Sequence, residues 1–352
     1  MDQAHISGTA VIITGGLIHE SHAKTAHGLL CSSKRFKILG IIDEKHAGLD
    51  ASYFVKDTLK GIPVVQSIDV FINTYGMPEY AIIGMATKGG LLPQELYESI
   101  QNVLKNGIHL VNGLHEPLND IDEFQPFLGG AAKIFDVRKS KPFKELHFWQ
   151  GKIAQITALK IAVLGMDCAV GKRTTSRFLE EQLKMQGYLA EMIYTGQTGW
   201  MQGADYGLLF DATPNDFIPG ELEHALYSCW KEKGVDILII EGQSSLRNPS
   251  GPCGSEFIIS CDLDGVVLQH VPFRKKFSGF DQYHTHIPDV LDEVDLIKHL
   301  GAQVLGITLN GEGIEAKKLT KYRDFLARKT SIPVVIPMIE TMDPIISNIL
   351  NQ

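Results

Sequence analysis

The chain has 352 residues, of which 44% are hydrophobic and 21% are charged, and its formal net charge is −8. This length exceeds what a single hydrophobic core commonly supports, so two domains are expected. The acidic balance excludes the global basic field that drives nonspecific binding to nucleic acid or anionic lipid, and we expect neither partner. No apolar run approaches the roughly 18 residues of a membrane span.

The five cysteines are odd in number, scattered, and form no C-x-x-C pair. This usage argues against a disulfide framework and against a structural zinc site, so we expect a reducing cytoplasm and no metal site. The stretch MDQAHISGTAVIITGG carries an acidic residue ahead of a short apolar run, which is not the pattern of a signal peptide or a membrane anchor.

The first third of the chain alternates short apolar runs with segments of helical periodicity. The runs are TAVIITGG, FKILGIIDE, IPVV, EYAIIGMA and IHLVNG. This alternation predicts a parallel sheet with helices on its faces, and we assign residues 1–138 to a Rossmann-like domain. Asp43 ends the second run, but G-x-G-x-x-G is absent, so the pattern gives little support to a dinucleotide site.

After residue 136 the chain becomes basic and polar, with a proline and no periodicity, and we predict a linker over residues 139–154. A second alternation fills residues 155–352, with helices expected near 171–187, 219–233 and 289–300. The fold class is therefore α/β with two parallel-sheet domains, and the second is expected to resemble a P-loop NTPase. Its apolar runs are LKIAVLG, LAEMIYTG, VDILIIEGQ, LDGVVLQHV, AQVLGITLNG and IPVVIPM.

The stretch IAVLGMDCAVGKRTT is the strongest motif in the chain. An apolar run ends at Gly165, and Gly171 and Lys172 open a helical segment, which is the arrangement of a phosphate-binding loop. Five residues separate the two glycines, where the common pattern has four, and this spacing resembles the loop of dethiobiotin synthetase. The residues expected to bind phosphate are Gly165, Met166, Asp167, Cys168, Ala169, Val170, Gly171, Lys172, Arg173, Thr174 and Thr175.

One position departs from that pattern. Arg173 follows the lysine where a Ser or Thr normally binds Mg²⁺, and Thr174 comes one place later, turned by about 100° on a helix. An arginine there suits a second phosphate or a substrate carboxylate, because its planar fork bonds such groups bidentately. The alternative is a solvated surface arginine.

Three other strand ends carry polar groups. Glu241 and Gly242 end the run VDILIIEG, so the carboxylate is expected at the edge of the sheet where ligands gather, unless it only caps the strand. Gln197 and Thr198, in TGQTGWM, belong either to a flexible ligand-binding loop or to an ordinary turn. Asn310 ends ITLNG, where several nucleotide-binding proteins place an Asn that contacts the base, although a plain turn fits equally well.

The segment HVPFRKKFSGFDQYHTHIPD combines cations, aromatic rings and two histidines. It is either a solvated loop over the sheet edge or a lid that supplies Arg274 and a titrating His284 to an anionic substrate. The spacing of His284 and His286 is a poor helical metal site.

Taken together, the Rossmann-like domain, the basic linker and the motifs GMDCAVGKRTT, TGQTGWM, IIEGQSSL and GITLNG resemble a bacterial family long catalogued as a domain of unknown function. Some members of that family are assigned as D-glutamate N-acetyltransferases of the DgcN type. The resemblance covers nearly the whole chain. It implies transfer of acetyl from acetyl-CoA to the amino group of D-glutamate or a related D-amino acid.

That chemistry needs a base for the amine and donors for the oxyanion on the thioester carbonyl. Glu241 is the candidate base, with His284 and Asp167 as alternatives, and Lys172 completes the candidate catalytic set. We expect backbone N–H groups of TGQTG or GQSS to stabilise the oxyanion. The candidate substrate-binding residues are Arg173, Gln197, Thr198, Gln243, Arg247 and Arg274.

Two other functions stay open from the sequence. An ATP-dependent ligase or kinase of the dethiobiotin synthetase type would place Lys172 on the transferring phosphate and Mg²⁺ on Glu241. A nucleotide-gated binding protein would need a protein partner. Only the phosphate loop supports this third function. A homo-oligomer is expected because α/β domains often associate.

Overall fold

The computed structural model describes residues 6–55 and 60–352. Its contacts divide the chain into two compact units. The N-terminal unit comprises Met1–Lys141 together with Gln197–Asp205, and the P-loop unit comprises Pro142–Gly196 together with Tyr206–Gln352. One short segment of the second half of the chain therefore belongs to the N-terminal unit.

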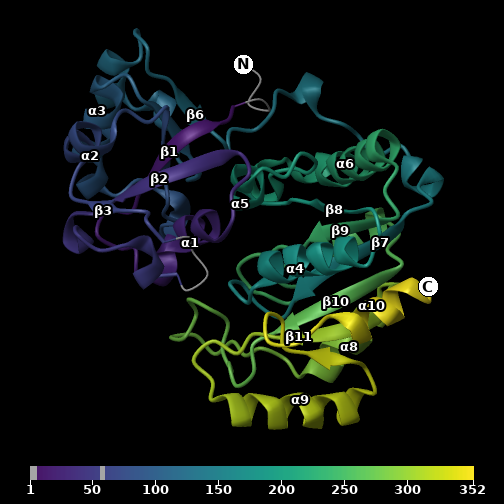
Figure 1. Ribbon diagram of the computed structural model, residues 1–352. Coiled ribbons are helices and arrows are strands. Elements are labelled where there is room, and N and C mark those ends of the chain that lie inside the picture. Colours follow the sequence, from purple (N-terminus) through teal and green to yellow (C-terminus); the bar gives the residue numbers. More distant parts are fainter. Residues whose placement is uncertain (1–5, 56–59) are drawn as a thin grey trace. The chain divides into compact units, whose positions relative to one another are not determined.

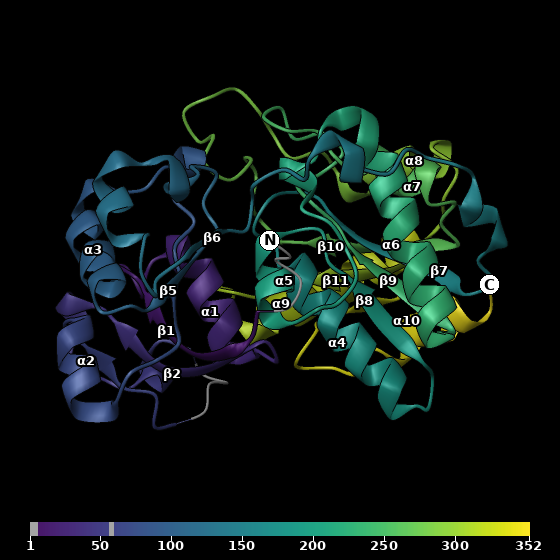
Figure 2. The same cartoon turned by 90° about the horizontal axis from the view of Figure 1, so that it is seen from above.

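The N-terminal unit is built on a six-stranded sheet in the order β3-β2-β1-β4-β5-β6, and every pairing in it is parallel. Figure 2 shows α2 and α3 on one side of this sheet and α1 on the other. The predicted parallel sheet with covered faces is confirmed. The elements are β1 (Gly8–Ile13), α1 (Lys24–Cys31), β2 (Phe36–Ile42), β3 (Val64–Val65), α2 (Ile68–Tyr75), β4 (Tyr80–Ile83), α3 (Tyr97–Lys105), β5 (His109–Asn112) and β6 (Ile134–Asp136).

The N-terminal unit also contains helix α5 (Gln197–Gln202), whose six residues are all buried. The Trp200 ring lies under the guanidinium of Arg35, 4.4 Å from its centroid, and the Nε of Arg35 donates to the Trp200 carbonyl at 2.8 Å. Gln202 donates its amide to the Gly28 carbonyl of α1 at 2.7 Å. The sequence suggested a flexible loop or a turn here, and the structure has a buried helix.

The P-loop unit is built on a second six-stranded parallel sheet, in the order β12-β11-β10-β7-β9-β8 (Figure 1). The helices predicted near 171–187, 219–233 and 289–300 correspond to α4, α6 and α8. The elements are β7 (Leu159–Gly165), α4 (Lys172–Met185), β8 (Ala190–Ile193), α6 (Ile218–Lys233), β9 (Ile237–Glu241), α7 (Ser255–Ser260), β10 (Gly265–His270), α8 (Val290–His299), β11 (Val304–Leu309), α9 (Ala316–Thr330), β12 (Val334–Val335) and α10 (Asp343–Leu350).

Two cores sandwich this sheet because successive residues of a strand face opposite sides. Ile161 and Val163 of β7 pack with α4 and α10. Ala162 and Leu164 face the other side, where α6, α7, α8 and α9 cover the sheet. Figure 2 shows α4 on one side of the sheet and α7 and α8 on the other. Since all strands are parallel, their carboxyl ends meet at one edge, which gathers the loops that follow them.

Within the described part of the chain, none of the helices combines the length and the apolar character that crossing a membrane requires.

Candidate phosphate-binding site

The phosphate loop runs from the end of β7 at Gly165 to the start of α4 at Lys172. A Cβ on Gly165 would lie 2.9 Å from Cδ of Lys172 and 2.9 Å from Cγ2 of Val170, so only glycine lets the lysine side chain fold back over the strand end. Gly171 has a φ of +102°, a left-handed conformation that favours glycine. Both glycines of the motif are therefore required by local geometry.

Lys172 is buried within this loop. Its Nζ donates to the carbonyl oxygens of Asp167 and Ser244, each at 2.8 Å. Burial lowers the pKa of Lys172, and the nearby acidic groups, Cys168, Asp167, Cys253 and Glu241, oppose that shift. A phosphate placed beside Lys172 would offset the cost of burying its charge, because a nearby opposite charge favours the ammonium form.

The Asp167 carboxylate is fully engaged in bonds to the surrounding loops. Its Oδ1 accepts from the backbone N–H of Cys168 at 2.7 Å, and its Oδ2 accepts from Arg274 at 3.0 Å and from the N–H of Ser278 at 2.9 Å. Arg274 also donates to the Cys168 carbonyl at 3.0 Å. The structure thus brings two predicted site residues together, and their ion pair anchors segment 271–289 to the phosphate loop.

The first turn of α4 differs from that of a metal-nucleotide site. Arg173 is half-buried and Thr174 is exposed. Thr175 is buried and donates its hydroxyl to Oε1 of Gln269, which also accepts from Thr308 at 2.6 Å. The buried hydroxyl of this turn is therefore committed to a contact within the protein.

Asn310 follows β11 and joins the phosphate loop directly. Its Nδ2 donates to the Val170 carbonyl at 3.1 Å, and its Oδ1 accepts from the N–H of Glu312 at 2.9 Å. The structure therefore brings Asn310 into contact with the phosphate loop.

The carboxyl ends of β8 and β9 form a second polar cluster. Glu241 is 6% exposed; its carbonyl accepts from the Thr195 hydroxyl at 2.6 Å and its Oε2 from the Thr195 N–H at 3.3 Å. Gln243 donates to the same hydroxyl at 3.1 Å. Glu241 stands opposite Val163 in the pairing of β9 with β7, the strand that leads into the phosphate loop, so its carboxylate lies at the same sheet edge as that loop.

Other predicted substrate residues have partners of their own. Gln197 accepts from Arg138 at 2.7 Å, and Thr198 lies 3.3 Å from the Thr25 hydroxyl, all inside the N-terminal unit. Arg247 pairs with Glu293 through its Nε at 2.8 Å. His284 is exposed, and its ring makes no hydrogen bond within the described residues.

Two residues of the site, Asn248 and Gln269, were missed from the sequence, and Ser244 was singled out there only for its backbone N–H. The Ser244 carbonyl accepts a hydrogen bond from the ammonium of Lys172. The side-chain amide of Asn248 lies 3.4 Å from Oδ1 of Asp167. Oε1 of Gln269 accepts from the hydroxyls of both Thr175 and Thr308. A signal for Gln269 was present, because it is a polar residue near the end of the otherwise apolar run LDGVVLQHV. Nothing local marks Ser244 or Asn248 apart from their position after β9.

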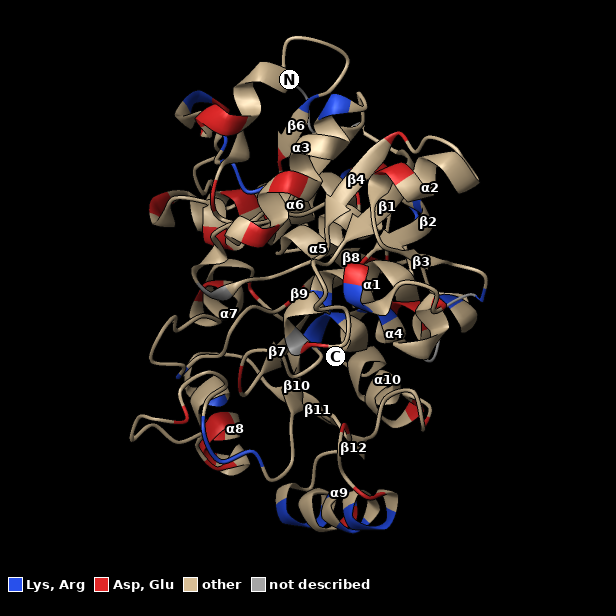
Figure 3. Ribbon diagram, turned by 90° about the vertical axis from the view of Figure 1, so that its left-hand side faces the viewer, with Lys and Arg blue, Asp and Glu red and all other residues tan. Residues whose placement is uncertain are grey.

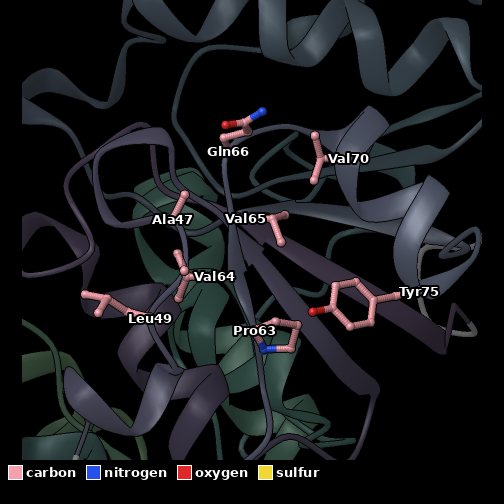
Figure 4. A pocket seen from close by; sticks show the side chains of 9 residues that line it. Ala47, Leu49, Pro63, Val64, Val65, Gln66, Val70 and Tyr75 are labelled. Carbon is pink, nitrogen blue, oxygen red and sulfur yellow. The ribbon is translucent and has the colours of Figure 1, made fainter.

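The N-terminal unit holds a separate open cavity of about 310 Å³ beside its edge strand β3, between the loop 47–49 and α2 (Figure 4). Its lining is apolar apart from the amide of Gln66 and the hydroxyl of Tyr75, so it offers no charged group to a phosphate.

The Asp43 carboxylate, which follows β2, already has partners within the N-terminal unit. It accepts from the Thr14 hydroxyl at 2.7 Å and lies 2.8 Å from Nδ1 of His46.

Two models of known protein families match this chain, one in each half. A family model described as "Domain of unknown function (DUF1611_C) P-loop domain" matches residues 147–346, and its companion "DUF1611_N Rossmann-like domain" matches residues 44–140. The chain belongs to the DUF1611 family. The predicted Rossmann-like and P-loop folds and the family resemblance are confirmed by these matches.

Curated relatives and a solved structure agree with that assignment. A Pseudoalteromonas protein named D-glutamate N-acetyltransferase is 28% identical over 76% of this chain and 80% of its own length. A protein of the same name from Tritonibacter scottomollicae is 26% identical over 73% of this chain and 76% of its own. The crystal structure of a DUF1611 family protein from Anabaena variabilis is 26% identical, with a TM-score of 0.89 over 98% of this chain and 100% of that one.

Proposed function

We propose that this chain transfers the acetyl group of acetyl-CoA to the amino group of D-glutamate or a related D-amino acid. The names of the two curated relatives support this reaction class. The observation that carries the choice of donor is the position after Lys172, where Arg173 stands in place of the hydroxyl that holds Mg²⁺ in common phosphate loops. Two adjacent cations suit the pyrophosphate of coenzyme A without a metal.

The reaction requires a neutral amine. The substrate ammonium gives one proton to a base, and its nitrogen forms a bond to the thioester carbonyl carbon. The carbon–sulfur bond then breaks, and the second proton lost by the nitrogen passes to the leaving coenzyme A thiolate. Glu241 is the proposed base, because it lies at the carboxyl edge of the sheet beside the buried ammonium of Lys172. Backbone N–H groups near Gly196 and Gln243 are the proposed oxyanion donors.

Of the other candidate residues, two are proposed to position the phosphate loop and two to contact the ligands. Asp167 and Arg274 are proposed to position the loop, because their ion pair already uses the groups that catalysis would need. Arg173 is proposed to hold a substrate carboxylate or a second phosphate. Arg247 is a weaker substrate ligand, because Glu293 already occupies its guanidinium.

The test is an assay of the purified protein with acetyl-CoA and either D-glutamate or L-glutamate, in the presence of a metal chelator. Thiol release and an N-acetylated product from the D-enantiomer are expected, and Lys172→Ala should remove both. A reaction that instead requires ATP and Mg²⁺ and yields ADP would overturn the proposal in favour of a ligase or kinase.

A further inference from the structure

An aromatic surface lies where β10 and α9 meet in the P-loop unit, and we call Phe273 and Tyr322 the aromatic shelf. Their ring centroids are 5.1 Å apart, and the Phe273 side chain is 47% exposed. Phe325, also half-exposed, extends this surface, with its centroid 6.3 Å from that of Tyr322. Exposed flat rings of this kind are the surfaces on which nucleobases stack.

Two residues at this surface, Phe273 of the shelf and His270 beside it, have features that cost free energy. Phe273 has a φ of +67°, which is a strained conformation for a bulky residue. His270 is 6% exposed; its Nε2 lies 3.1 Å from the Tyr322 hydroxyl, while its Nδ1 finds no hydrogen-bond partner among the described residues. Burial lowers the pKa of His270 to about 4, so the imidazole is neutral near pH 7. A neutral, partly unsatisfied imidazole can bond a ligand.

Lysines gather on α9, the helix that carries Tyr322, although the chain as a whole is acidic. The Nζ of Lys318 lies 4.1 Å from the ring centroid of Phe273. Lys317 and Lys321 are exposed nearby, and none of these three lysines forms an ion pair within the described residues. Figure 3 shows the basic bands along α9. The shelf therefore combines stacking surface with unneutralised positive charge.

The shelf is connected to the phosphate loop through one residue. The N–H of Asn310 donates to the His270 carbonyl at 2.8 Å, while its side chain donates to the Val170 carbonyl of the loop. The chain then passes from Asn310 into α9, which carries Lys318 and Tyr322. A nucleotide whose pyrophosphate lies in the loop would therefore extend past Asn310 toward the shelf.

We propose that the aromatic shelf binds the adenosine 3′-phosphate end of coenzyme A, with adenine stacked on the exposed ring of Phe273, the tilted ring of Tyr322 at its edge, and the 3′-phosphate paired with Lys318. This inference rests on the proposed function. It distinguishes coenzyme A from ATP by experiment, because ATP has no 3′-phosphate for the lysine to pair with. The flexible four-carbon stem of Lys318 lets its ammonium move from the ring to the phosphate.

The experiment compares coenzyme A with 3′-dephospho-coenzyme A by calorimetry, using the full chain. The natural protein should bind coenzyme A about tenfold more tightly than the dephospho form, and Lys318→Ala should remove that difference. Lys298→Ala is the matched control, because Lys298 is exposed in the last turn of α8, which leads to the amino end of β11 at the opposite edge of the sheet. It should preserve the difference.

The outcomes separate this inference from the proposed function. Failure of the natural protein to bind either form would overturn the proposed function itself. Equal binding of the two forms, or a Lys318→Ala variant that keeps the difference, would overturn the shelf assignment alone. Phe273→Leu adds an independent check: both forms should bind about tenfold more weakly if adenine stacks there, and unchanged binding would contradict the stacking.

Discussion

The two units of this chain share an architecture and differ in what their strand ends do. Each has a six-stranded parallel sheet with helices on both faces. In the N-terminal unit, Asp43 at the end of β2 is satisfied by Thr14 and by the backbone and ring of His46. In the P-loop unit, the strand ends surround the buried ammonium of Lys172, which donates to the carbonyl oxygens of Asp167 and Ser244. Function therefore follows from the loops and not from the sheet.

The largest expected effect concerns the two strand-end carboxylates. Glu241→Gln should lower kcat for acetyl transfer by about 10²- to 10⁴-fold, because loss of a general base costs that much, while coenzyme A affinity stays the same. Asp43→Asn is the matched variant in the other unit. It should lower the thermal stability and leave kcat unchanged, and a Glu241→Gln enzyme of unchanged kcat would remove Glu241 from the mechanism.

The next effect is the pH dependence of stability that His270 of the P-loop unit contributes. The pKa of folded His270 is lowered from 6.5 to about 4, chiefly by burial; Asp289 opposes this shift and Arg274 adds to it. Below pH 6.5 the unfolded chain takes up a proton that the folded chain does not. This linkage should therefore remove up to about 3 kcal/mol of stability as the pH falls from 6.5 to 4.

Denaturant unfolding followed at several pH values would measure this loss. His270→Asn should flatten the dependence between pH 6.5 and pH 4 relative to the natural protein. An identical slope in the two proteins would show that other groups cause it.

A smaller effect tests the glycine at the end of β7. In Gly165→Ala the new methyl group would meet Lys172 and Val170 at 2.9 Å, so the lysine must shift, at a cost of about 1–3 kcal/mol. We expect a lower melting temperature and weaker coenzyme A binding. Gly129→Ala in the N-terminal unit places its methyl in open space and should change neither quantity.

The sequence predicted the sheets well because their strands are runs of Val, Ile and Leu, a signal that survives without knowledge of distant contacts. It also predicted the phosphate loop, whose glycines and lysine are close in the chain. Helix α5 was not predicted, because its six residues are all buried and so show no helical periodicity.

Long-range partners account for the other differences. Gln197 is bonded to Arg138 and Arg247 to Glu293, residues far apart in the sequence. A polar side chain at a strand end looks available for a ligand until its partner is known. The sequence therefore predicted the phosphate loop from local pattern, whereas the partners of these side chains could not be read from it.

The central claim is that the phosphate loop holds coenzyme A without a metal. Calorimetry of the purified protein with coenzyme A in the presence of a chelator, and separately with ATP with and without Mg²⁺, tests it most directly, with Lys172→Ala as the comparison and Lys45→Ala as the matched lysine of the N-terminal unit. We predict metal-free coenzyme A binding that Lys172→Ala weakens by about 10- to 100-fold and Lys45→Ala leaves intact. Binding of ATP alone, and only with Mg²⁺, would contradict the account.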